Sequence, residues 1–107
     1  MTAPIKKSKI PRIAYNNPDE LYRFFTENRP KVRDHISESI KYAITNKLEN
    51  IELFELRYSM DSRNIIVLNM KKSNWKSCLQ NIIDELVASE KLEDCIPLRD
   101  MMSQIEE

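Results

Sequence analysis

Two cysteines and one histidine are the side chains of this 107-residue chain best suited to nucleophilic or metal chemistry. A cysteine nucleophile needs a nearby base and a lowered thiol pKa. Cys78 and Cys95 both fall on the apolar sides of expected helices, where a free cysteine usually packs as a small hydrophobic residue. Nothing in the sequence brings His35 to either sulfur atom. We therefore interpret both cysteines as packing residues and expect no catalytic residue.

The other ionisable side chains show no pattern typical of a metal or acid–base site. A structural zinc site takes about four ligands, usually in closely spaced pairs, and this spacing is missing. Acidic pairs occur at Glu52 with Glu55 and at Glu93 with Asp94. A general acid needs a buried carboxyl group with a raised pKa, whereas the alternating pattern around Glu55 predicts a solvent-facing side chain. We expect no metal site, no cofactor and no enzymatic activity.

Glycine is absent from the chain. Phosphate-binding loops, dinucleotide fingerprints and nucleophile elbows all contain glycine, because backbone must approach the ligand closely or adopt a positive φ angle. The composition therefore argues against nucleotide-dependent chemistry.

Charge is balanced overall, with 17 basic and 17 acidic side chains, but it is unevenly distributed. Residues 1–13 hold four basic and no acidic side chains, whereas residues 79–107 hold eight acidic and two basic ones. Such asymmetry predicts contacts that are specific to each end. The partner-binding residues that we expect at the two ends are Lys6, Lys7, Lys9, Arg12, Glu93, Asp94, Arg99 and Asp100.

The N-terminal stretch MTAPIKKSKIPRIAY is basic and lacks the apolar run of a secretory leader. No stretch approaches the roughly 20 apolar residues of a membrane-spanning helix. We expect a cytoplasmic protein with reduced thiols and no membrane contact. The frequent use of Ile, Asn and Lys suits an AT-rich genome, bacterial or phage.

Residues 1–15 are predicted to form an extended basic arm, because Pro4 and Pro11 disfavour helix at the residues before them. The arm is either a frayed terminus or a strap for an acidic partner. Residues 16–107 are predicted to form a single α+β domain in the order α-α-β-β-α-α.

The first two helices have clear local signals. Asn17, Pro18 and Glu20 form an N-terminal capping pattern, and Pro30 predicts the end of the first helix near Asn28. The second helix is predicted from apolar residues at three- and four-residue spacing. These residues are Val32, Ile36, Ile40, Ala43, Ile44 and Leu48.

A change of period then predicts one antiparallel β-hairpin packed on the amphipathic helices. Phe54, Leu56, Tyr58 and Met60 alternate with polar residues, as in a half-buried strand. The β-branched segment NIIVLNM follows after the turn-like DSRN. An unpaired edge of this hairpin can accept a strand from another chain.

Two further helices are predicted after the hairpin, each with an apolar stripe. The stripe of the first comprises Trp75, Cys78, Leu79, Ile82, Ile83 and Leu86. The stripe of the second comprises Leu92, Cys95, Ile96, Met102 and Ile105. We expect both stripes to pack in the core.

The closing stretch, LQNIIDELVASEKLEDCIPLRDMMSQIEE, combines apolar and charged residues in a distinctive pattern. The residues that carry this pattern are Leu79, Ile83, Leu92, Glu93, Cys95, Leu98, Arg99, Asp100, Met102 and Ile105. Through them, residues 79–107 resemble the UVR motif, a short antiparallel helical hairpin of the excision-repair proteins UvrB and UvrC and of some protease adaptors and chaperones. Pro97 departs from the motif and predicts a helix that begins near Asp94 or bends, because proline is tolerated in a first helical turn. The resemblance implies a protein-docking hairpin without a catalytic role.

Together these features predict a small adaptor or regulator that docks on a larger host protein. Self-association is a variant, because the basic start of one copy can reach the acidic end of another. The alternative is a nucleic-acid-binding regulator that uses the basic arm and the lysines around Trp75, with Trp75 and Tyr58 stacking on bases. A cysteine-dependent enzyme is a third hypothesis.

Overall fold

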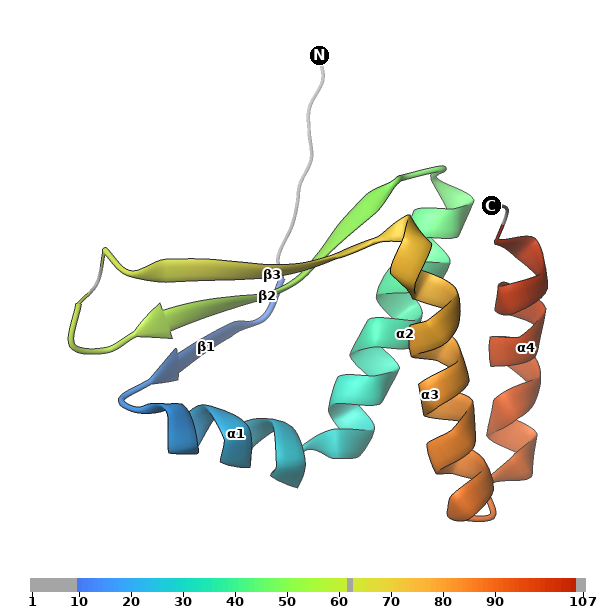
Figure 1. The fold of residues 1–107 in the computed structure, drawn as a ribbon, viewed down its shortest axis with the longest axis horizontal. Helices are drawn as coiled ribbons and strands as arrows, with labels where there is room; N and C mark the ends of the chain where they lie inside the picture. Colours follow the sequence, from blue (N-terminus) through green and yellow to red (C-terminus); the bar gives the residue numbers. More distant parts are fainter. Residues whose placement is uncertain (1–9, 62, 106–107) are drawn as a thin grey trace. The chain divides into compact units, whose positions relative to one another are not determined.

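The computed structural model describes residues 10–61 and 63–105 and has an α+β fold, as the sequence predicted (Figure 1). Lys6, Lys7 and Lys9 lie outside the described residues. In chain order the elements are β1 (Arg12–Tyr15), α1 (Pro18–Glu27), α2 (Arg29–Thr45), β2 (Asn50–Tyr58), β3 (Ile65–Lys71), the 3-10 helix η1 (Lys72–Asn74), α3 (Trp75–Ala88), the 3-10 helix η2 (Leu92–Asp94) and α4 (Cys95–Gln104).

The chain divides into two compact units. The first contains β1, α1, β2 from Glu52 onward and β3 as far as Asn69. The second contains α2 from Pro30 onward, the adjoining ends of β2 and β3, and the helices that follow them. Each unit has its own buried apolar residues, which are described in turn below.

A third strand in the first unit corrects the predicted order and the predicted hairpin. The sheet has the strand order β1-β2-β3 and is mixed, because β1 runs parallel to β2 while β3 runs the opposite way (Figure 1). Arg12 lies opposite Glu55, and Tyr15 lies opposite Tyr58. The end of the predicted arm is therefore extended but paired. The sequence analysis missed β1 because this strand is only four residues long and its parallel partner, β2, follows after two intervening helices. Such a strand leaves little pattern in the local sequence.

Helix α1 covers one face of this sheet. The rings of Phe25 on α1 and Phe54 on β2 meet edge to face, with centroids 5.3 Å apart, a favoured arrangement for aromatic pairs. Ile13 and Leu56 are register partners and are both buried. The predicted cap is confirmed, because the Asn17 side chain accepts a hydrogen bond from the Glu20 backbone N–H at 3.0 Å.

The second unit is helical, and α3 and α4 lie side by side in opposite directions (Figure 1). Its largest fully buried side chains include Trp75, Ile40 and Leu79. The Trp75 indole N–H donates to the Met70 carbonyl oxygen at 3.2 Å, so the polar atom of this buried ring is satisfied. The predicted α3 stripe is confirmed, except that Cys78 is only half-buried.

Helix α4 begins at Cys95 and takes Pro97 into its first turn. The missing N–H of proline costs nothing there, because first-turn N–H groups have no partner within the helix. The buried face of the helix runs through Cys95, Leu98 and Met101. The prediction that Leu92 and Ile96 pack in the core is wrong: each is 62% exposed.

Helices α2 and α3 both end without glycine in a Schellman arrangement. After α2, Leu48 N–H donates to Ala43 O at 2.9 Å, and Lys47 has a φ of 57°. After α3, Lys91 N–H donates to Leu86 O at 2.8 Å, and Glu90 has a φ of 61°. The second of these turns directs the chain from α3 into η2 and α4.

Candidate functional site

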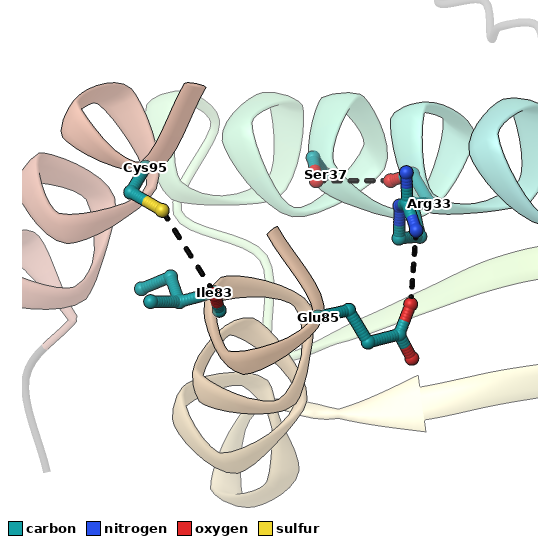
Figure 2. Close-up of polar contacts among 5 residues, drawn as sticks. All are labelled: Arg33, Ser37, Ile83, Glu85 and Cys95. Atoms are coloured by element: carbon teal, nitrogen blue, oxygen red, sulfur yellow. Dashed lines mark hydrogen bonds and ion pairs between the residues drawn. The ribbon is translucent and has the colours of Figure 1, made fainter. Parts of the chain in front are cut away.

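The two cysteines differ in burial: Cys95 is buried, as expected for a packing residue, whereas Cys78 is half-buried. Cys95 is 4% exposed, and its Sγ lies 3.9 Å from the carbonyl oxygen of Ile83 on the neighbouring helix (Figure 2). Burial raises the pKa of the Cys78 thiol, and the nearby Glu85 carboxylate raises it further. A raised pKa keeps the sulfur protonated near neutral pH, which makes it a poor nucleophile.

The remaining candidate features of the sequence were a metal site, a membrane-spanning helix and a stacking surface at Trp75. The described residues contain no group of three or more His, Cys, Asp and Glu side chains that could hold a metal ion. Within the same part of the chain, no helix is both long enough and apolar enough to cross a bilayer. Trp75 is 1% exposed, so its ring cannot stack on a nucleic-acid base.

Arg12 is the one predicted residue of the basic arm that the structure describes. Its side chain is 68% exposed, and its Nε lies 3.7 Å from a Glu55 carboxylate oxygen. Arg57 pairs with the same carboxylate from β2. Glu55 is therefore 17% exposed rather than solvent-facing, because parallel pairing with β1 places Arg12 across from it.

A polar contact fixes α2 to α3 within the second unit. Arg33 Nη1 donates to Glu85 Oε1 at 3.1 Å, and the two side chains are 16% and 32% exposed (Figure 2). The Arg33 carbonyl oxygen also accepts a hydrogen bond from Ser37 Oγ at 2.9 Å (Figure 2). This contact holds α3 in place as one side of the α3–α4 hairpin.

The four acidic and basic residues predicted near the C-terminus all lie on this hairpin. Glu93 and Asp94 are exposed in η2, where the two long helices are joined. Arg99 and Asp100 are exposed further along α4. The structure thus brings these predicted residues onto one helical pair, in two groups.

Three exposed apolar side chains accompany the first group. Val87, Leu92 and Ile96 are 45%, 62% and 62% exposed. They lie in the last turn of α3, at the start of η2 and in the first turn of α4, so they share the end of the hairpin at which the helices are joined. We call these three residues the hairpin-tip patch. Its acidic rim comprises Glu90, Glu93 and Asp94, with the exposed Lys91 between the first two, so the rim has a net negative charge.

Sequence reasoning missed the hairpin-tip patch because it assigned Leu92 and Ile96 to the core. A signal was present: Cys95, Leu98 and Met101 recur at three-residue spacing, which defines a helix face of its own. Ile96 follows Cys95 directly and therefore points about 100° away from that face.

A hollow between α2 and α4 is a second feature of the helical unit. Its volume is about 240 Å³, and its lining includes Lys41, Ile44, Asp100 and Met101. Small-molecule sites usually measure about 300–1,000 Å³ and hold several convergent polar groups. The hollow is smaller than that range, and its charged lining residues include one cation, Lys41, and one anion, Asp100.

The α3–α4 hairpin thus has an exposed apolar end, an acidic rim and a shallow hollow beside it. Cys95 is buried and Cys78 is half-buried, and Glu85 contacts Arg33 while Glu93, Asp94, Arg99 and Asp100 are exposed. Neither a known protein family, nor a curated protein sequence, nor a solved structure matches this chain.

Proposed function

We propose that this chain is a small non-enzymatic adaptor or regulator that docks on a larger protein through the hairpin-tip patch. The observation that carries the proposal is the exposure of Val87, Leu92 and Ile96 where the two helices are joined, whereas Ile83, Leu86, Cys95 and Leu98 of the same hairpin are buried. An exposed apolar cluster rimmed by charge is typical of a protein-binding surface.

The partner surface that fits the patch is apolar and edged by basic side chains. Complete burial of a Val, Leu or Ile side chain contributes about 1.5–3 kcal/mol, so burying the roughly half-exposed patch contributes about 1 kcal/mol per side chain. The acidic rim of Glu90, Glu93 and Asp94 adds attraction to a basic surface, which raises the association rate and selects the partner.

The packing of the hairpin supports the same role. Helix α4 buries Cys95, Leu98 and Met101, and the contact between Arg33 and Glu85 joins α3 to α2. A preorganised surface loses little conformational entropy on binding, so more of the contact energy appears as affinity. The resemblance of residues 79–107 to the UVR motif, whose hairpins dock on proteins, points in the same direction.

The test is affinity capture from a lysate of the source cells, using the immobilised chain and a variant with both Leu92→Asp and Ile96→Asp. Each changed side chain is 62% exposed, so the fold should tolerate the substitutions. Wild-type protein is expected to retain a partner that the double variant loses. Raised salt should weaken capture, because the acidic rim contributes to binding.

A Tyr22→Asp variant is the matched control, because Tyr22 is 75% exposed on α1 in the other unit. This variant should capture the same partner as the wild type. Equal capture by wild type and by the double variant, or capture lost equally in the Tyr22 variant, would refute docking through the hairpin-tip patch.

A further inference from the structure

Strand β3 is an edge strand with apolar side chains exposed on both of its faces. Ile65, Ile66, Val67 and Leu68 are 44%, 45%, 38% and 37% exposed. Successive side chains of a strand point to opposite faces, so Ile65 and Val67 share one face while Ile66 and Leu68 share the other. The strand order β1-β2-β3 leaves the outer edge of β3 without a neighbouring strand in the described chain.

Most of this edge lacks the features that keep edge strands apart. Natural edges usually have charged side chains, a proline or a bulge, whereas residues 65–70 contain no charged residue and no proline, and β3 has a charge only at its last residue, Lys71. Apolar residues on both faces are typical of a strand that is covered on both faces and paired on both edges. The segment is thus suited to the interior of a larger sheet.

We infer that β3 pairs antiparallel with β3 of a second copy of this chain, which joins the two sheets into one continuous sheet. A neighbouring strand that covers Ile65 and Val67 on one face and Ile66 and Leu68 on the other must itself be apolar on both faces. Within the described chain β3 meets this requirement over its first four residues, Ile65 to Leu68, and its charged residue is the last one, Lys71. Strand β1 instead begins with an exposed arginine, and β2 has glutamates and an arginine along its length.

Charge selects the antiparallel arrangement. Parallel pairing in register would place Lys71 beside the same lysine of the second copy, while Lys72 in η1 pairs with Glu49 at 3.9 Å. Antiparallel pairing instead places Lys71 near the loop before β3 of the second copy, where Asp61 and Arg63 form an ion pair of 3.5 Å and no net charge. The chain as a whole also has a net charge of zero, so long-range repulsion does not oppose association.

The arrangement closes as a two-fold dimer. Each β3 edge is used once, and the outer ends of the joined sheet are the two β1 strands. A four-residue β1 is a poor template for further pairing, because short edges limit strand addition. Strand-edge pairing alone buries less than the ~1,200–2,000 Å² of a standard protein interface, so we expect a weak dimer that forms only as the concentration rises.

Sedimentation velocity of the full chain from low micromolar to millimolar concentration tests this inference. The wild type is expected to shift from monomer to dimer. Val67→Lys places a charge in the middle of the edge and is expected to raise the dimer Kd about tenfold or more. Ile96→Lys, a matched change on the hairpin-tip patch, should leave the Kd unchanged.

Hydrogen exchange of the wild type gives an independent readout that does not depend on any variant folding. The backbone amides of residues 65–71 should exchange more slowly at high concentration than at low concentration, while the amides of α4 should not change. A monomer at every concentration, a dimer disrupted by Ile96→Lys instead, or concentration-independent exchange in β3 would overturn the inference. If the protein is monomeric at every concentration, the occupant of the β3 edge would instead be an extended segment of a different protein.

Discussion

Arg33 and Glu85 link α2 to α3 through a hydrogen bond of 3.1 Å between Nη1 and Oε1, with both side chains largely covered. A charged pair in such a position is worth more than one at the surface, because water screens it less. Glu85 is also one of the two causes that raise the pKa of the Cys78 thiol. This contact therefore affects both helix packing and cysteine chemistry.

A double-mutant cycle with Arg33→Met and Glu85→Gln should measure this contact. Each single variant is expected to lower the free energy of unfolding by about 1–2 kcal/mol, because the remaining partner loses a charged hydrogen bond. The coupling energy should be about 1 kcal/mol. Urea denaturation followed by circular dichroism gives these values.

The exposed pair of Arg63 and Asp61 is the control for that cycle. These side chains are 90% and 44% exposed, so their coupling energy should be about 0–0.5 kcal/mol. Equal coupling in the two cycles would contradict the role assigned to Arg33 and Glu85.

Cys78 should react slowly with thiol reagents in the native protein. Burial, and secondarily Glu85, raise the pKa of its thiol, so the thiolate is scarce at pH 8. Alkylation followed by peptide mass mapping should show slower labelling of Cys78 in the native chain than in the urea-unfolded chain. Rapid labelling of Cys78 in the native protein at pH 8 would instead support the hypothesis of a cysteine-dependent enzyme.

The same raised pKa predicts how stability depends on pH. Between the ordinary thiol pKa of about 8.5 and the higher folded value, the folded state holds a proton that the unfolded state has released. The free energy of unfolding therefore falls as pH rises through this window, and the contribution is fully present below it. The measurement compares the free energy of unfolding of the wild type with that of Cys78→Ala from about pH 8 to pH 11. The excess stability of the wild type over the variant should narrow as pH rises.

Lys47→Gly should stabilise the protein, unlike most glycine substitutions. Lys47 has a φ of 57° after α2, a conformation that costs a residue with a side chain about 1–2 kcal/mol but suits glycine. Glycine also loses more conformational entropy on folding, which offsets part of this benefit. We therefore expect the free energy of unfolding, measured by thermal or urea denaturation, to rise by about 0.5–1 kcal/mol. Lys41→Gly, in the exposed middle of α2, should instead cost about 1 kcal/mol.

The local parts of this fold could be predicted from sequence, and the non-local parts could not. The α1 cap at Asn17 and the buried α3 stripe from Trp75 follow from neighbours within a few residues. The strand at Arg12–Tyr15 depends on a partner some forty residues later in the chain, which no local period reveals. The low exposure of Glu55 was not predicted for the same reason. Arg12 contacts Glu55 only because β1 pairs with β2.

The candidate site shows a similar division. Glu93 and Asp94 were correctly expected on the surface from their charge, since unpaired charges are rarely buried. Leu92 and Ile96 were placed in the core because of their residue type, although the rotation of α4 about its axis decides which apolar residues are covered. That rotation follows from packing Cys95, Leu98 and Met101 against α3, which a count of apolar residues does not determine.

Ile13→Ala tests the strand that the sequence analysis placed in a basic arm. Ile13 is 7% exposed and lies opposite buried Leu56, so its truncation should lower the free energy of unfolding by about 2–4 kcal/mol. Ile96→Ala is the same substitution at a 62% exposed position and should change it by less than about 0.5 kcal/mol. Urea titrations of both variants, followed by circular dichroism and by tyrosine fluorescence near Tyr15 and Tyr58, measure the difference. Each substitution removes three side-chain carbons, but only Ile13 loses buried contacts if residues 12–15 pack in the sheet. Equal effects of the two substitutions on the free energy of unfolding would therefore mean that residues 12–15 are not held in the sheet in solution.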